Sequence, residues 1–134
     1  MSKVVFTAAI MDAFHNGHKN IIDEMRKRGD IVIVVLHDDL ACYLIKDKFP
    51  IQTIQQRIYN VYTAGADIVI PCHDVDPVVE FHDILQWFPD AVFLRGDDNM
   101  NPPGKYILDE MGVEQIYIPY TKDISSTKIR KEHE

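Results

Sequence analysis

The chain has 134 residues, of which 46% are hydrophobic and 26% charged, and its formal net charge is −7. This length and composition predict one folded domain and exclude intrinsic disorder and collagen-like fibres. The negative charge disfavours a nucleic-acid surface, because binding to a phosphate backbone depends on clustered Lys and Arg.

Short apolar runs rich in β-branched residues alternate with segments of helical spacing. The runs cover residues 4–6, 31–36, 67–70, 91–94 and 115–118, and the helical segments cover 17–28, 52–63 and 77–88, with a last one beginning at Ser125. Because the best runs are apolar throughout, they predict strands covered on both faces. The predicted fold class is therefore α/β: a single Rossmann-like, doubly wound domain with a five-stranded parallel sheet between helix layers.

In such a sheet the loops at the carboxyl ends of the strands gather at one edge, where ligands bind. These loops cover residues 12–18, 37–48, 72–76, 95–104 and 119–127. His37, His73 and His82 carry no motif. Trp87 and Phe88, at the end of a helical segment, are expected in the core.

Two further features bear on the compartment. No apolar run is long enough to span a bilayer, and residues 1–5 open without a secretory signal pattern. Cys42 and Cys72 lack the spacing of a metal site, which favours two reduced, packed thiols over a disulfide. We therefore expect a cytoplasmic protein.

The loop at residues 12–18 reads DAFHNGH and leads from the first strand into the first helix. His15 and His18 would point the same way, and Gly17 would let a ligand approach the helix N-terminus. As protonated or neutral donors, the two imidazoles could stabilise charge on a displaced phosphoryl group. The alternative is that one histidine caps the turn and the other packs. Zinc binding is disfavoured, since no further Cys or His stands at ligand spacing.

This loop resembles the HxGH signature of the nucleotidyltransferase superfamily, in the cytidylyltransferase form GxFDxxHxGH. Three later segments resemble the same family in the same order along nearly the whole chain. They are the basic residues Lys46 and Lys48 followed by Arg57, the turn RGDD at residues 95–98, and the segment at residues 121–130, which is similar to RTxGISTTxI followed by Lys or Arg.

The resemblance implies transfer of CMP from CTP to a phosphorylated small alcohol such as glycerol 3-phosphate, with release of pyrophosphate. It implies Mg²⁺ as cofactor and a homodimer. Adenylyltransferases that use ATP share a similar terminal motif and are the alternative. The implied catalytic residues are His15, His18 and Lys46; the implied nucleotide-binding residues are Ala9, Ile10, Asp12, Gly17, Asp97, Asp98, Thr121, Ser125, Ser126 and Thr127; the implied acceptor-binding residues are Lys48 and Arg57.

Several of these positions have a second interpretation from the residues themselves. Arg57 would either reach the acceptor or brace the site by a salt bridge. Asp12 would orient His15, bind Mg²⁺ or cap the first helix. Adjacent carboxylates such as Asp97 and Asp98 are also good turn residues, and Ser125 is also a good helix N-cap.

The sequence departs from the cytidylyltransferase pattern at three places. Ala9 and Ile10 stand where the pattern has Gly-Thr, Met11 replaces Phe, and Tyr120 replaces the Arg before Thr121. A phenol does not replace a guanidinium on a phosphate, so Arg95, Lys122 or Arg130 would have to compensate. A homologue that binds nucleotide without turnover is therefore the alternative from another functional class.

Overall fold

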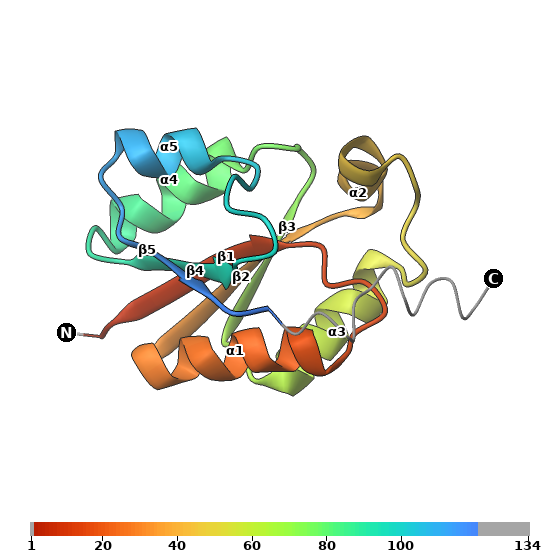
Figure 1. The fold of residues 1–134 in the computed structure, drawn as a ribbon, viewed down its shortest axis with the longest axis horizontal. Coiled ribbons are helices and arrows are strands. Elements are labelled where there is room, and N and C mark those ends of the chain that lie inside the picture. Colours follow the sequence, from red (N-terminus) through yellow and green to blue (C-terminus); the bar gives the residue numbers. More distant parts are fainter. Residues whose placement is uncertain (1, 121–134) are drawn as a thin grey trace.

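The structure, a computed structural model, describes residues 2–120 (Figure 1). Its strands are β1 (Val4–Ala9), β2 (Ile31–His37), β3 (Ile68–Cys72), β4 (Val92–Gly96) and β5 (Gln115–Ile118). Its helices are α1 (Asn16–Arg28), α2 (Asp39–Lys46), α3 (Ile54–Ala64), α4 (Val78–Trp87) and α5 (Lys105–Glu110). The predicted fold class is confirmed, since all five expected strands form one parallel sheet.

The strand order is β3-β2-β1-β4-β5, so the winding direction switches between β1 and β4. The β1–β2 ladder runs the length of β1, from Val4 to Ala9. The β1–β4 ladder, in contrast, pairs only Val5 with Val92 and Phe6 with Phe93. Since β1 continues to Ala9 and β4 to Gly96, the sheet opens at its carboxyl edge at the switch point.

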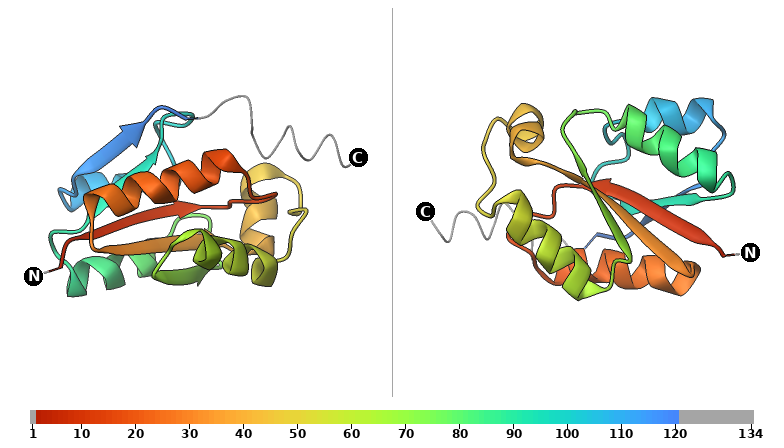
Figure 2. Two further views of the ribbon diagram at one scale, coloured as in Figure 1. Left: turned by 90° about the horizontal axis from the view of Figure 1, so that it is seen from below. Right: turned by 180° about the vertical axis from the view of Figure 1, so that it is seen from behind.

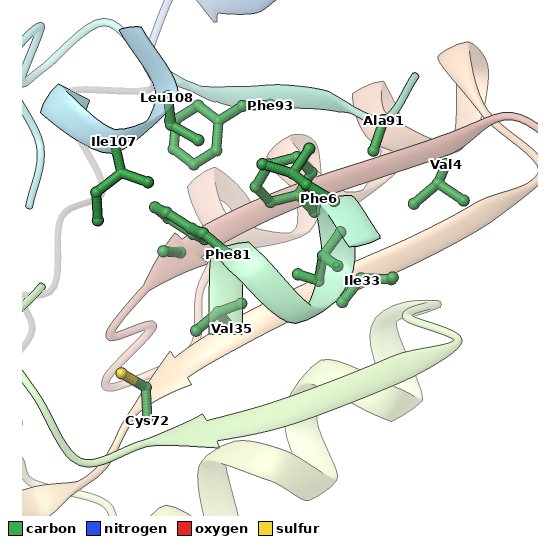
Figure 3. Packing of buried hydrophobic residues seen from close by; sticks show 13 residues of the cluster. Val4, Phe6, Ile33, Val35, Cys72, Phe81, Ala91, Phe93, Ile107 and Leu108 are labelled. Carbon is green, nitrogen blue, oxygen red and sulfur yellow. The ribbon is translucent and has the colours of Figure 1, made fainter. Parts of the chain in front are cut away.

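The sheet separates two apolar cores. As Figures 1 and 2 show, α4 and α5 cover one face, and α1 and α3 cover the other. On the first face Phe6, Phe81 and Phe93 pack edge to face, with ring centroids 5.4 to 5.9 Å apart (Figure 3). On the second, Ile22 and Met25 of α1 pack with alternate residues of the strands. Burial on both faces explains why the strand sequences are apolar throughout.

Local signals fix the ends of the long helices. His15 caps α1, and Thr53 and Gln56 form a capping box at the start of α3. Gly29 and Gly65 follow the last residues of α1 and α3. The expected cap at Ser125 lies outside the described residues.

Three expectations need correction. Residues 39–46, expected within a loop, form α2, a helix of eight residues that is capped by Asp38 and buries only Ala41 and Cys42. The short helix α5 was also not predicted. Trp87 is 75% exposed and not in the core, because α4 ends there and turns its last residue outward; Phe88 packs against the core as expected.

Cys42 and Cys72 are both buried and neither forms a disulfide, in agreement with the sequence. Among the helices of the described residues, none combines the length and the apolar character needed to cross a membrane.

Candidate active site

A pocket of about 290 Å³ opens at the carboxyl edge of the sheet, where β1 and β4 part. It therefore lies at the switch point, where doubly wound sheets bind their ligands. Residues from β1, β2 and β4, from α1 and α2, and from the segments that follow β1, β4 and β5 line it: Thr7, Ala9, Ile10, Met11, His18, Ile21, His37, Ile45, Lys46, Arg95, Gly96, Asp98, Asn99, Pro103 and Tyr120.

The two predicted histidines form one unit at the start of α1. Their rings stack with centroids 3.8 Å apart. The Gly17 amide donates to His15 Nδ1 at 2.9 Å, and the His15 amide donates to His18 Nδ1 at 3.4 Å. Because both Nδ1 atoms accept, each neutral ring carries its proton on Nε2. The cap that the sequence offered as an alternative role is thus present, and it orients both Nε2–H groups.

Burial keeps both imidazoles neutral. It lowers the pKa of His15, and it lowers the pKa of His18 to about 3, with the nearby His15 and Lys46 acting in the same direction. Of the two forms considered from the sequence, protonated or neutral donors, the structure selects neutral N–H donors. A neutral donor in a buried site stabilises developing negative charge at any pH near neutrality.

Two buried polar atoms of the described residues lack a hydrogen-bond partner, and both lie at this site. They are Nε2 of His15 and Oγ1 of Thr7. Thr7 is 1% exposed and lines the pocket. Unpaired polar atoms are costly to bury and are often found where a ligand binds. Thr7 was not predicted, although its place near the end of β1 was a usable signal.

The lysines of the basic segment are placed differently. Lys46, the last residue of α2, lines the pocket, and its charge acts on His18. Lys48 is exposed and is not among the pocket-lining residues. Its backbone carbonyl accepts from the Cys42 thiol at 3.5 Å. Of the two lysines, Lys46 is therefore the one that lies at the pocket.

Arg57 has the bracing role of its two predicted alternatives, and this corrects its assignment to the acceptor. Its side chain is fully buried. The guanidinium donates to the carbonyls of Ile10 and His37 at 2.9 and 2.6 Å, and to the Asp39 carboxylate at 2.7 Å. A guanidinium with this set of protein partners holds the ends of β1 and β2 in place and presents no surface to an acceptor.

Asp12 is also a brace. Its carboxylate is buried and accepts from the amides of Ile51 and Gln52 at 2.8 and 2.9 Å, which ties the segment before α3 to the first loop. The suggestion that Asp12 caps α1 is wrong, since His15 occupies that position.

The two carboxylates of the turn after β4 lie in different surroundings. Asp98 lines the pocket. Asp97 is a turn residue whose amide donates to the Ile118 carbonyl at 2.8 Å and whose carboxylate accepts from the Tyr120 amide at 3.1 Å. Gly96 leaves room for the Tyr120 ring, because a Cβ there would lie 2.6 Å from Tyr120 Cδ2.

Arg95 stands beside this turn and lines the pocket. It donates to the Ala8 carbonyl at 3.1 Å, across the gap where the β1–β4 ladder has ended. Burial lowers its pKa from a very high value, so the guanidinium remains charged. Of the three cations named as substitutes for the missing Arg, Arg95 is described here and lies at the pocket.

The other predicted residues lie either at or near the pocket or outside the part of the chain that the structure describes. Ala9 and Ile10 line the pocket, and Gly17 is buried in the first turn of α1. Thr121, Ser125, Ser126 and Thr127 lie outside the described residues, as do Lys122 and Arg130. Within residues 2–120 no group of three or more His, Cys, Asp or Glu side chains is arranged to hold a metal ion.

Comparison with known proteins identifies the family. The sequence profile of the cytidylyltransferase-like family matches residues 6–132. The chain belongs to the cytidylyltransferase-like family. This confirms the resemblance seen in the sequence and, at the level of the family, the prediction of a nucleotidyltransferase.

The bifunctional protein HldE of Desulfatibacillum aliphaticivorans is 27% identical over 132 residues, which cover 95% of this chain and 26% of that relative. The HldE protein of Nitrosococcus oceani is 33% identical over 101 residues, covering 70% of this chain and 20% of that relative. The chain thus spans about a quarter or less of the length of these curated relatives.

Among solved structures, the lipopolysaccharide core biosynthesis protein from Thermoplasma volcanium superposes with a TM-score of 0.72 at 20% identity, covering 91% of this chain and 100% of that one. A putative nicotinate-nucleotide adenylyltransferase from Vibrio parahaemolyticus gives a TM-score of 0.67 at 19% identity, covering 98% and 86%. At these identities the likeness concerns the fold.

Proposed function

We propose that this chain transfers a nucleoside monophosphate from a nucleoside triphosphate to a phosphorylated small molecule, with release of pyrophosphate. The observation that carries the proposal is the stacked, neutral pair of His15 and His18, whose Nε2–H groups are fixed by backbone hydrogen bonds at the N-terminus of α1. Oriented donors at a helix N-terminus suit a phosphoryl group that gains negative charge.

The reaction is a direct in-line displacement. An oxygen of the acceptor phosphate attacks the α-phosphorus, the bond from that phosphorus to the bridging oxygen breaks, and pyrophosphate leaves with the electron pair. No covalent enzyme intermediate forms. His18 and His15 donate to the α-phosphoryl oxygens, and Lys46 and Arg95, the cations lining the pocket, attract the phosphates.

Two further roles come from the family resemblance. Thr121, Ser125, Ser126 and Thr127 are proposed to hold the leaving pyrophosphate. Mg²⁺ is the expected cofactor, and the absence of a three-ligand cluster among residues 2–120 fits an ion bound largely by the substrate phosphates. Asp98, at the pocket wall, is the described carboxylate best placed to help hold it, and the ion would neutralise triphosphate charge.

The donor nucleotide has two candidates. The sequence pattern and the family description favour CTP, with an acceptor such as glycerol 3-phosphate. The likeness of residues 124–130 to the terminal motif of adenylyltransferases, together with a putative adenylyltransferase among the structural neighbours, supports ATP. We further propose a homodimer that acts in the cytoplasm.

The test is a matrix of reactions. Pyrophosphate release is measured for each of the four triphosphates against phosphorylated alcohols, sugar phosphates and mononucleotides, with Mg²⁺ and with EDTA. We expect one triphosphate and one acceptor class to stand out. Tight nucleotide binding without release in any pairing would instead identify a non-catalytic binder, and sedimentation of the same sample reports the oligomeric state.

A further inference from the structure

His37 lines the active-site pocket, yet neither the sequence motifs nor the mechanism above uses it. It is the last residue of β2 and is 2% exposed. It pairs in register with Cys72, and both continue the sheet face that packs against α4. His18 enters the same pocket from α1, on the other face. A ligand at the edge of the sheet therefore meets an imidazole from each side.

The two imidazoles have opposite hydrogen-bonding character. Nδ1 of His37 lies 3.2 Å from the backbone carbonyl oxygen of Asp74. A carbonyl oxygen only accepts, so this Nδ1 carries the proton and Nε2 carries a lone pair. Among residues 2–120 no donor is hydrogen-bonded to that Nε2. The pocket thus holds a donor at His18 and an acceptor at His37.

The surroundings of His37 keep its ring in place and in the neutral form. Arg57 holds its backbone carbonyl at 2.6 Å. Burial lowers the pKa of His37 to about 4, opposed by the bond to Asp74 and by Asp38, and assisted by the nearby charges of Arg95 and Arg57. The ring is neutral at physiological pH, and its lone pair is available to a ligand.

A lone pair in this position selects its partner chemically. It repels the oxygens of an ionised phosphate, which offer no hydrogen, and it attracts an O–H or N–H donor. The unpartnered hydroxyl of Thr7 in the same pocket is a second group that awaits a polar ligand atom. The groups of the pocket lining that attract phosphate are the cationic side chains of Lys46 and Arg95.

We propose that His37 is a specificity-determining residue whose Nε2 accepts a hydrogen bond from a hydroxyl group of a substrate. The hydroxyl belongs either to a phosphorylated polyol or sugar acceptor or to the ribose of the triphosphate. The inference rests on the proposed function and deepens it, because it selects hydroxylated substrates over deoxygenated ones of the same charge.

The first experiment needs no variant. Long-range ¹H–¹⁵N spectra of the histidine rings report which nitrogen carries the proton, and we expect His37 to be protonated on Nδ1 and His18 on Nε2. Glycerol 3-phosphate, ribose 5-phosphate, ATP and CTP are then added in turn, and the one that supplies the hydroxyl is expected to shift the His37 Nε2 resonance. A proton on His37 Nε2 in the free protein contradicts the proposal.

The second experiment compares matched ligand pairs by equilibrium binding. The acceptor arm pairs glycerol 3-phosphate with propyl phosphate and ribose 5-phosphate with 2-deoxyribose 5-phosphate. The nucleotide arm pairs ATP and CTP with their 2′-deoxy and 3′-deoxy forms. We expect a preference of about tenfold for the hydroxylated member in one arm, which identifies the source of the hydroxyl.

That preference should disappear in His37→Phe, which has no acceptor, and should persist in part in His37→Gln, whose side-chain amide oxygen can still accept a hydrogen bond. It should also persist in His82→Phe, a change at an exposed histidine of α4. Equal preferences in wild type and in His37→Phe, or no preference in either arm, overturn the proposal. Pyrophosphate release is scored separately: discrimination without turnover refutes the proposed function alone, and turnover without discrimination refutes this inference alone.

Discussion

At the scale of single residues, the chemistry of the site depends on which imidazole nitrogen carries the proton. His15 and His18 are close in sequence, but their tautomers follow from the amides of Gly17 and His15 itself. The sequence left open whether the two rings are protonated or neutral, and burial favours the neutral form by lowering both pKa values. The pair acts as two aligned dipoles and not as two cations.

Replacing His18 with Ala is expected to lower turnover by about 100-fold or more, because a preorganised donor to the transition state is lost. Pyrophosphate release under saturating substrate measures it. His82→Ala, at an exposed position of α4, is the matched control and should retain full turnover. Turnover of His18→Ala within threefold of wild type would remove His18 from the mechanism.

The buried histidines also predict how stability depends on pH. The pKa of His18 is about 3 in the folded protein and about 6.5 when unfolded, so the unfolded chain binds more protons between these values. The contribution of His18 to the free energy of unfolding is therefore fully present above pH 6.5 and is lost as the pH is lowered. At pH 5 the protonation of this histidine in the unfolded chain lowers the free energy of unfolding by about 2 kcal/mol.

Urea midpoints measured from pH 8 to pH 5 test this, with His18→Gln and His82→Gln compared. The His18 variant should lose less stability on acidification than wild type, and the His82 variant should follow wild type. Parallel curves for all three proteins would be inconsistent with a neutral, buried His18.

At the scale of elements, the site depends on loops that are tied to each other through backbone groups. Arg57 of α3 joins the carbonyls at the ends of β1 and β2 to Asp39 of α2, and Asp12 holds the segment before α3. The ties explain why residues far from the phosphate site matter for its shape. A sequence motif does not distinguish an arginine that braces the protein from one that binds substrate, and for this reason the sequence suggested both roles for Arg57.

Arg57→Ala should destabilise the fold by about 3 kcal/mol, because it leaves buried carbonyls and the Asp39 carboxylate without their donor. Chemical denaturation gives the value. Arg28→Ala, which removes an arginine paired with Glu24 on the outer surface of α1, should cost about 0.5 kcal/mol or less. Similar costs for the two variants would contradict the buried brace.

Gly96→Ala tests the turn between β4 and the pocket. The added Cβ would lie 2.6 Å from the Tyr120 ring and 2.9 Å from Asp98 Oδ1, so we expect a loss of about 1–3 kcal/mol. In a Tyr120→Ala background the same change should cost less, since the ring is gone. A double-mutant cycle on the free energy of unfolding measures the coupling, and additive effects would show that the ring does not rest on Gly96.

At the scale of the whole molecule, the strand order places the functional groups of residues 2–120 at one edge. β1 and β2 bring Thr7 and His37, α1 brings His18, and β4 brings Arg95, all to the opening between β1 and β4. Because β1–β4 pairing ends at Phe6 and Phe93, the opening is built into the sheet. Ligand binding there should therefore report on the stability of the entire fold.

A bound triphosphate with Mg²⁺ at about 100 times its Kd should stabilise the protein by about 2.7 kcal/mol and raise its Tm by several degrees. Thermal melts with ATP, CTP, GTP and UTP rank the donors without needing the acceptor. EDTA should reduce the shift, and His82→Ala should leave it unchanged. Equal melting temperatures with and without all four triphosphates would contradict a nucleotide site.

The sequence by itself determined the α/β class, the five strands, the long helices and the family, because these follow from local periodicity, caps and a contiguous motif. It also located the histidine pair and the RGDD turn. Only the tertiary structure decided what each polar group does. The burial of Arg57, the tautomer of His37 and its place in the pocket depend on partners far away in the chain, and the exposure of Trp87 depends on how α4 packs. Hydrogen-bond partners and burial are properties of the packed chain, and a motif does not contain them.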